Sequence, residues 1–323
     1  MSFSGMPFDD VRSVLEQIEA LDQDAGSAMA RAFARAGHAG NALGRLKDLG
    51  VWLAATRGRT PPLIGKTGVA LYASTHGFSE NAAVALAEQQ ARVDAVASGA
   101  APVSHLCVAN DLSLNVFELA LDMPCDDARR AASLDERSCA ATIAFGMEAT
   151  AEGVDLLSIG ALGKEAPIAG ASILCALFDG GFEHLERDAR AVVEAVHTFH
   201  GARLGEPLEI LRCLGGRDIA ALVGAILAGR VQGIPVILDG LPALAACGVL
   251  HALKPEATAH CMLAGAGTEM ERWVAEKLDL VALVDLRLSQ EPGCAGALAA
   301  AVVKSAAALA GGVFEVAERQ SAL

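Results

Sequence analysis

Short apolar segments recur along the middle of the chain, and each ends in a polar or glycine-rich turn. This pattern predicts strands at residues 68–73, 103–109, 155–159, 234–239, 258–263 and 280–288. Between them, apolar residues at helical spacing predict helices at residues 80–98, 139–151, 169–178, 185–200, 219–228, 241–252 and 270–278. Strands that alternate with helices are joined by crossovers. The sequence therefore predicts an α/β fold, with a mostly parallel sheet that helices cover on both faces.

The N-terminal part of the chain has a helical pattern without strands. Residues 8–36 and 42–56 carry apolar positions near the helical period, and residues 58–62 contain the glycine and prolines that end the second pattern. We therefore expect two amphipathic helices before the first strand.

Composition narrows the classes of function. The chain has 323 residues, 53% of them hydrophobic, which is enough for a large buried core. Its 25 Lys and Arg against 39 Asp and Glu give a net charge of −14, and only 4% of the residues are aromatic. Broad binding to nucleic acid or to an anionic membrane needs a basic face, and stacking on single strands needs aromatic side chains. We therefore expect neither a nucleic acid nor a membrane as a partner.

The sequence predicts a cytoplasmic protein with free thiols. The first ten residues, MSFSGMPFDD, are acidic and do not resemble a secretory signal. No stretch approaches the roughly 18 uncharged apolar residues of a membrane-spanning helix. The eight cysteines are scattered without a CxxC pair, which argues against a zinc site or a disulfide framework. His197 and His200 have no third ligand nearby, so we expect no metal ion.

Candidate chemistry lies just after the strands, because ligands of open parallel sheets bind beyond the carboxyl ends of the strands. Four such turns carry polar residues or glycines, at residues 74–77, 160–167, 239–240 and 289–293. In the second turn, Gly160 and Gly163 precede Lys164, and Pro167 opens a helix of small residues. Backbone N–H groups, a helix N-terminus and a lysine charge in one place can hold a phosphate.

Each of these features also has a purely structural interpretation. The glycine-rich turn is compatible with an ordinary connection that leaves Lys164 in solvent. His76 could simply form a hydrogen bond within the fold, and Asp239 with Gly240 could simply cap a helix. Gln290 and Glu291 could be plain loop residues. The residues alone leave both interpretations open.

A set of ordered motifs adds a family resemblance over most of the chain. The motifs are LGRLKDLGVWLA at 43–54, THG at 75–77, QQ at 89–90 with GAA at 99–101, GVDLLSIGALGKEAPI at 153–168, LGGRDIAALVGAILAG at 214–229, PVILDG at 235–240 and DLRLSQEPGCAGALA at 285–299. In this order and spacing they resemble the nicotinate-nucleotide:dimethylbenzimidazole phosphoribosyltransferase family of cobalamin biosynthesis.

The resemblance implies an architecture and a reaction. It implies a Rossmann-like parallel sheet in a large domain of residues 61–299 with the ligand crevice, and a small helical domain of residues 1–60 and 300–323. It also implies a homodimer. The family moves phosphoribose from nicotinate mononucleotide to a benzimidazole nitrogen, which gives α-ribazole phosphate and nicotinate without a metal or redox cofactor. The implied partners are therefore a small nucleotide and an aromatic base.

The resemblance also assigns roles to residues, with departures at the reactive positions. The general base of the family is a glutamate at the position of Gln290, and an amide cannot take up a proton at neutral pH. Glu291, one residue on, is the candidate replacement. Ala161 and Thr75 also replace acidic residues of the family pattern. The substrate-binding positions carried over are His76, Gln90, Gly160, Gly163, Lys164, Asp239, Gly240, Arg287 and Gly293.

These departures keep two other functions open. A catalytically silent relative would bind a nucleotide or a partner subunit, for example as a heteromer with an active paralogue. A different phosphoribosyl or nucleotide enzyme on the same scaffold is the other alternative.

Overall fold

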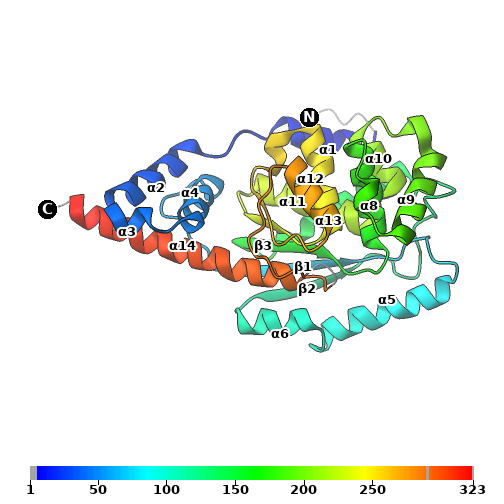
Figure 1. The fold of residues 1–323 in the computed structure, drawn as a ribbon, viewed down its shortest axis with the longest axis horizontal. Coiled ribbons are helices and arrows are strands. Elements are labelled where there is room, and N and C mark those ends of the chain that lie inside the picture. The colour runs from blue at the N-terminus through cyan, green and yellow to red at the C-terminus, as the bar shows by residue number, and fades with distance from the viewer. Residues whose placement is uncertain (1–5, 289–290, 322–323) are drawn as a thin grey trace.

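The computed structural model describes residues 6–288 and 291–321. Its central sheet is parallel, with the strand order β2-β1-β3-β4-β5 (Figure 1). The strands are β1 (Thr67–Ala73), β2 (Ser113–Glu118), β3 (Leu156–Ala161), β4 (Val236–Leu238) and β5 (Cys261–Leu263). The predicted α/β fold with a parallel sheet is confirmed.

Helices cover both faces of the sheet (Figure 1). One layer contains α7 (Glu136–Gly146), α8 (Ala166–Leu177), α10 (Pro207–Leu214), α11 (Arg217–Val231) and α12 (Leu241–Leu253). The opposite layer contains α5 (Ala82–Ala97), α6 (Pro102–Ala109) and the N-terminal part of α14 (Cys294–Ser321). Side chains of a strand alternate between faces. Accordingly, Ala70 and Tyr72 join the core of the first layer, and Val69 and Leu71 join that of the second.

The remaining helices lie at the ends of the chain and around the main core. They are α1 (Asp9–Glu16), α2 (Gln23–Arg35), α3 (Gly37–Asn41), α4 (Arg45–Arg57), α9 (Arg187–His200) and α13 (Glu269–Lys277). Short 3-10 helices are η1 (Met147–Thr150), η2 (Phe182–His184), η3 (Gly201–Arg203) and η4 (Pro255–Thr258).

Helices α2 and α4 and the C-terminal part of α14 share a separate apolar cluster, and Figure 1 shows them extending away from the sheet. Phe33 and Met29 fill the centre of that cluster. Helix α1 packs instead on the main core, through Phe8 and Leu15. The division into residues 1–60 with 300–323 and residues 61–299 stays a prediction.

Helices α7 and α11 approach each other through glycines. A Cβ on Gly146 would lie 1.9 Å from the Ala221 carbonyl oxygen, and a Cβ on Gly224 would lie 1.9 Å from that of Ile143. A side chain at either position would collide with the backbone of the other helix, so the glycines set how closely α11 packs against α7.

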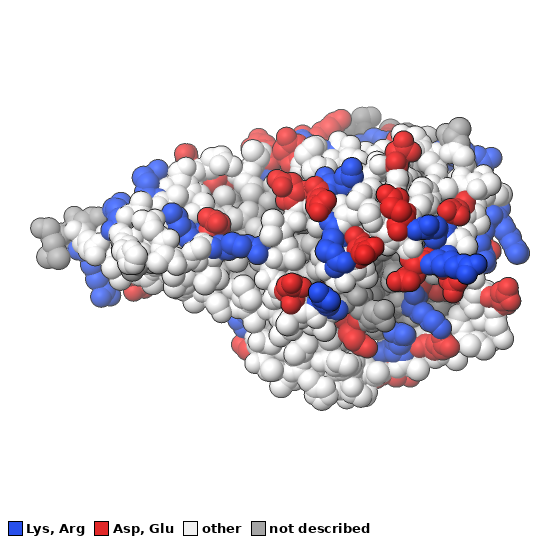
Figure 2. All heavy atoms as spheres, viewed as in Figure 1, with Lys and Arg blue, Asp and Glu red and all other residues white. Residues whose placement is uncertain are grey.

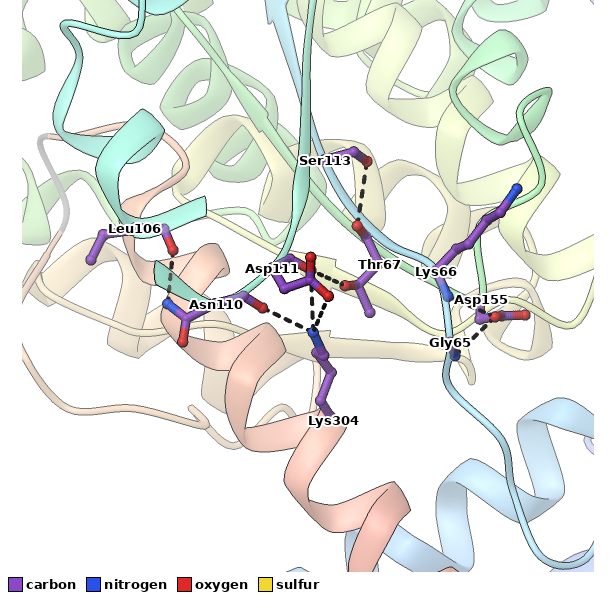
Figure 3. A network of polar contacts seen from close by, with 9 residues as sticks. All are labelled: Gly65, Lys66, Thr67, Leu106, Asn110, Asp111, Ser113, Asp155 and Lys304. Atoms are coloured by element: carbon purple, nitrogen blue, oxygen red, sulfur yellow. Dashed lines mark hydrogen bonds and ion pairs between the residues drawn. The ribbon is translucent and has the colours of Figure 1, made fainter. Parts of the chain in front are cut away.

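Polar contacts fix the amino-terminal edge of the sheet to the outer helices (Figure 3). The Asp155 carboxylate accepts the N–H groups of Gly65 and Lys66, each at 2.9 Å. On α14, Lys304 Nζ donates to the carbonyl oxygens of Asn110 at 2.9 Å and Asp111 at 3.2 Å. These contacts satisfy backbone groups in the segments that lead into β1 and β2.

Among the described residues, one helical stretch, Cys294–Gln320, is long and apolar enough to cross a membrane by length and composition. In this fold its buried alanines and valines, such as Ala299 and Val303, pack against the sheet. Lys304, within the same stretch, forms the contacts just described. The stretch therefore serves as a core helix of the α/β fold.

Two predicted strands are wrong. Residues 103–109 form helix α6, because Pro102 occupies its first turn after the extended Ala101. The neighbouring strand is β2, an edge strand that alternates between exposed and half-buried positions. Residues 280–288 make only an isolated bridge from Ala282 to Leu263, and Arg287 has a φ of 54° that ends extended structure.

The helix predicted at residues 8–36 is two helices, α1 and α2. Asp22 starts the second, because its side chain accepts the N–H of Ala25 at 2.9 Å.

Candidate active site

Two cavities lie side by side at the carboxyl ends of the strands. The Asp239 cavity, of about 330 Å³, is lined by residues from the ends of β3 and β4 and from α5, α12 and α13, among them Gly163, Asp239, Gly240 and Glu271. The His76 cavity, of about 170 Å³, is lined by residues after β1, by α5 and by the turn after β3, among them Ser74, His76, Gln89 and Glu165. Arg92 and Lys164 line both cavities, so the two form one crevice.

Asp239 follows β4 directly and is 6% exposed. Its Oδ2 accepts the N–H of Gly296, in the first turn of α14, at 2.7 Å. Burial raises the pKa of this carboxyl to about 7; the N–H of Gly296 opposes the shift and the negative charge of Glu271 adds to it. The protein thus holds a carboxyl group at the crevice that exchanges its proton near neutral pH.

Glu271 is the second carboxyl group that lines the Asp239 cavity. It is 2% exposed, and it forms a capping box with Thr268 at the start of α13. Its Oε2 accepts the Thr268 N–H at 2.9 Å. Burial raises the pKa of Glu271, against the hydrogen bonds from Thr268. Its hydrogen-bonding capacity is therefore committed to the helix end.

His76 forms a buried ion pair with Asp218 at the His76 cavity. The distance from His76 Nε2 to Asp218 Oδ2 is 2.9 Å, and both side chains are almost completely buried. Burial disfavours both charges, but the attraction between them dominates, so the pKa of His76 is raised and that of Asp218 is lowered. Gly216 leaves room for the ring, since a Cβ there would lie 2.3 Å from His76 Cε1.

The turn after β3 carries charges to the shared wall of the two cavities. Lys164 Nζ lies 3.5 Å from Glu88 Oε2 on α5, and the lysine side chain is largely exposed. Glu165 is half-buried, and burial raises the pKa of its carboxyl against the attraction of His76. Helix α8 begins at Ala166 with Pro167 in its first turn. The positive end of the α8 helix dipole therefore lies beside this wall.

The structure brings together only part of the predicted site. His76, Gly163, Lys164, Asp239 and Gly240 line the crevice. Gly160 lies in β3 just beneath it, where a Cβ would be 3.3 Å from the Asp239 carbonyl oxygen.

Four other predicted residues are described outside the lining of these cavities. Gln90 donates to Asp94 Oδ1 at 3.2 Å on its own helix, whereas its neighbour Gln89 donates to the Leu162 carbonyl at the crevice. Arg287 is exposed in a loop. Gly293 is buried with a φ of 82°, and Glu291 is exposed. Gln290 lies outside the described residues.

Sequence reasoning missed several lining or supporting groups. Arg92, Glu271 and Asp218 come from helices rather than from the strand ends. A signal existed for Glu271, because Thr268 and Glu271 have the T-x-x-E spacing of a capping box. That pattern predicts a helix start but not the cavity that the glutamate lines.

One face of the molecule carries charges of both signs. Figure 2 shows basic and acidic side chains interspersed over the main body of this face, and a mainly uncharged surface over α6.

All eight cysteines are free and buried, as predicted. Within residues 6–288 and 291–321, no cluster of three or more His, Cys, Asp or Glu is placed to hold a metal ion. His197 and His200 instead contact the carbonyl oxygens of Ser172 and Ala128, each at 2.9 Å.

Known proteins are similar to this chain in sequence and in fold. A family model described as "Phosphoribosyltransferase" matches residues 18–320. A nicotinate-nucleotide–dimethylbenzimidazole phosphoribosyltransferase from Brucella canis is 41% identical over 322 residues, which is 95% of each chain. The protein of that name from Brucella abortus (strain S19) is 40% identical over the same share. A crystal structure titled with this enzyme's name, from Thermus thermophilus, matches with a TM-score of 0.78 at 24% identity, over 88% of this chain and 95% of that one, and shows the shared fold. The chain belongs to the nicotinate-nucleotide–dimethylbenzimidazole phosphoribosyltransferase family.

Proposed function

We propose that this phosphoribosyltransferase moves the phosphoribosyl group of nicotinate mononucleotide to a benzimidazole-type base at the crevice. The observation that carries the proposal is the strand-end crevice itself, in a chain 41% identical to named enzymes of this activity. The products are α-ribazole phosphate and nicotinate, which places the reaction in cobalamin lower-ligand synthesis.

The phosphate of the donor suits the shared wall of the crevice. Lys164 adds a positive charge there, beside Gly163 and the positive end of the α8 helix dipole. Arg92 lines both cavities and makes no hydrogen bond or ion pair with the residues that the structure describes. Its guanidinium is therefore available for a phosphate.

The reaction needs positioning more than activation, because the donor already carries a good leaving group. As the acceptor nitrogen attacks C1′ of the ribose, the bond from C1′ to the pyridinium nitrogen breaks, and its electron pair neutralises the pyridinium ring. The apolar part of the Asp239 cavity, with Leu241, Pro242 and Pro292, suits a flat aromatic ring. Holding both rings beside one C1′ supplies the effective concentration that the step requires.

The test is turnover by the purified protein. Nicotinate mononucleotide and dimethylbenzimidazole are mixed with it, and α-ribazole phosphate and nicotinate are measured by chromatography. Product at a rate proportional to protein concentration is the expected result. Binding of the nucleotide without product would overturn the proposal and favour a catalytically silent relative. Adding a candidate active paralogue would then show whether the protein works as part of a heteromer.

Arg92→Ala tests the phosphate subsite by calorimetry. Loss of a charged hydrogen bond predicts a Kd for nicotinate mononucleotide raised by roughly 10–100-fold. Arg319→Ala, near the distant end of α14, is the matched control and should leave the Kd unchanged. An equal Kd in both variants would place the phosphate elsewhere.

The family resemblance also supports a homodimer, and the free, buried cysteines support a reducing cytoplasm. Sedimentation of the purified chain tests the first, and fractionation of the source cells tests the second. The catalytic role predicted for Glu291, next to Gln290 at the general-base position of the family, stays a prediction.

A further inference from the structure

We propose that Asp239 is the proton acceptor of the reaction, the group that takes the N–H proton of the attacking base. The inference rests on the proposed function and adds to it the residue that performs the proton transfer. A benzimidazole attacks through one ring nitrogen and becomes cationic unless the other ring nitrogen loses its hydrogen. A carboxylate within reach of that hydrogen is therefore required of the site.

The position of Asp239 fits this role. The residue lines the larger cavity at the end of β4, directly beside the turn that follows β3, and its carboxylate is buried at the base of that cavity. The hydrogen bond from Gly296 to Oδ2 fixes the orientation of the carboxylate. Ser158 and Gly296 pack tightly beneath it, since a Cβ on Gly296 would lie 2.0 Å from Ser158 Oγ. The carboxylate is therefore held rigidly, as an efficient base requires.

The other carboxylates near the crevice are committed or misplaced. Glu271 caps α13 through Thr268. Glu88 and Glu165 line the smaller cavity, where Lys164 and His76 attract them. Glu291 is exposed and outside the lining of both cavities. Asp239 is the remaining carboxylate of the larger cavity, and its Oδ2 accepts the N–H of Gly296 at the start of α14.

Charged and titratable groups from several elements surround Asp239. Glu271 on α13 is acidic, Arg92 on α5 and Lys164 after β3 are basic, and the Cys294 thiol on α14 lies nearby. Burial dominates and raises the pKa of Asp239 to about 7. At that value the ionised form is present at neutral pH and is still basic enough to accept a proton.

Atoms and electrons balance in this step. The lone pair of one acceptor nitrogen forms the new bond to C1′, and the C1′–pyridinium bond breaks, with its pair retained by nicotinate. The N–H hydrogen of the acceptor passes to Asp239 as a proton, and the N–H bonding pair stays in the benzimidazole ring. Asp239 then releases the proton to solvent, so each turnover liberates one proton.

Asp239→Asn is the central variant, because the amide oxygen can still accept the Gly296 N–H. We expect kcat to fall by roughly 10²–10⁴-fold with the Kd for nicotinate mononucleotide within a few-fold of wild type. Asp188→Asn, an exposed aspartate on α9 outside both cavities, is the matched control and should leave kcat unchanged. Circular dichroism confirms that the variants are folded.

The pH profile separates a proton acceptor from a merely structural cap. Wild-type kcat/KM should rise with pH through a limb near pH 7, and this limb should disappear in Asp239→Asn. A retained limb, or kcat within three-fold of wild type, would overturn the inference while leaving the proposed function intact. A greater loss of kcat in Glu291→Gln than in Asp239→Asn would also overturn it. Absence of product from the wild type would overturn the proposed function and this inference together.

Discussion

Replacing Asp239 by Asn should stabilise the protein at alkaline pH and much less at acidic pH. The carboxyl loses its proton at about pH 7 in the folded protein, against an ordinary value of 3.8. A raised pKa means that the folded state binds the proton more tightly than the unfolded chain does. Its contribution to stability is therefore greatest below pH 3.8, decreases as the pH rises to about 7, and is constant above that.

The size of the effect follows from this shift. About three pKa units correspond to roughly 4 kcal/mol that the ionised Asp239 costs the folded state at pH 8. At pH 5 the folded carboxyl is protonated, and the remaining cost is about 1.5–2 kcal/mol. The difference in the free energy of unfolding between wild type and Asp239→Asn should therefore change by about 2–3 kcal/mol from pH 5 to pH 8. For a chain of this length that is about 4 °C in Tm, at roughly 0.7 kcal/mol per degree.

The assay is urea denaturation of both proteins at half-unit steps from pH 5 to pH 8. Titrating groups that do not interact with Asp239 contribute equally to the two curves, so their difference reports Asp239 and its coupling to Glu271. The packing of the new amide adds an offset that does not vary with pH. A difference that is constant from pH 5 to pH 8 would refute the reasoning, because it would mean that the Asp239 pKa is ordinary.

Three further predictions concern the groups that support the crevice. Gly216→Ala places a Cβ 2.3 Å from His76 Cε1 and should lower the free energy of unfolding, measured by urea denaturation, by about 1–3 kcal/mol. In the double variant, His76→Ala should relieve this loss, whereas additive losses would contradict the contact. Asp218→Ala leaves His76 buried without its partner and should cost about 3–5 kcal/mol by the same measurement, whereas a loss below about 1 kcal/mol would show that the pair is not ionic. Lys304→Met removes the donor to the Asn110 carbonyl and should cost about 1–3 kcal/mol, with faster amide exchange at residues 110–113; unchanged exchange would contradict its role.

The general fold could be predicted because buried parallel strands are continuous apolar segments. Residues 68–73 and 155–159 correspond closely to β1 and β3, which helices cover on both faces. The same rule failed where the strand lies at the edge. Residues 113–118 alternate in exposure and carry polar side chains, so they do not form a continuous apolar segment. The strand was therefore predicted at the apolar residues just before them, which form α6. Periodicity alone cannot distinguish a short buried helix from a strand.

The site could be predicted only where it lies on strand ends. His76, Lys164 and Asp239 follow strands directly, and topology alone places them on one edge of the sheet. Arg92 and Glu271 reach the crevice from helices whose orientation depends on packing, which local sequence does not encode. The ion pair of His76 with Asp218 joins residues that are 142 positions apart in the sequence, so the local sequence around either residue does not predict it.

The placement of Asp239 raises the question of why a carboxylate is kept where it costs stability. An asparagine could accept the same N–H from Gly296, and an apolar residue would avoid the burial of a charge. A group that only capped α14 would therefore gain nothing from being an acid of raised pKa. A general base becomes more effective when its pKa is raised, because an aspartate of ordinary pKa is too weak a base to hold a proton near neutral pH. The burial that destabilises the fold is the same burial that makes Asp239 basic. Residues that trade stability for reactivity in this way are typical of active sites. If the stability and activity of Asp239→Asn change in opposite directions with pH, both effects have this single cause.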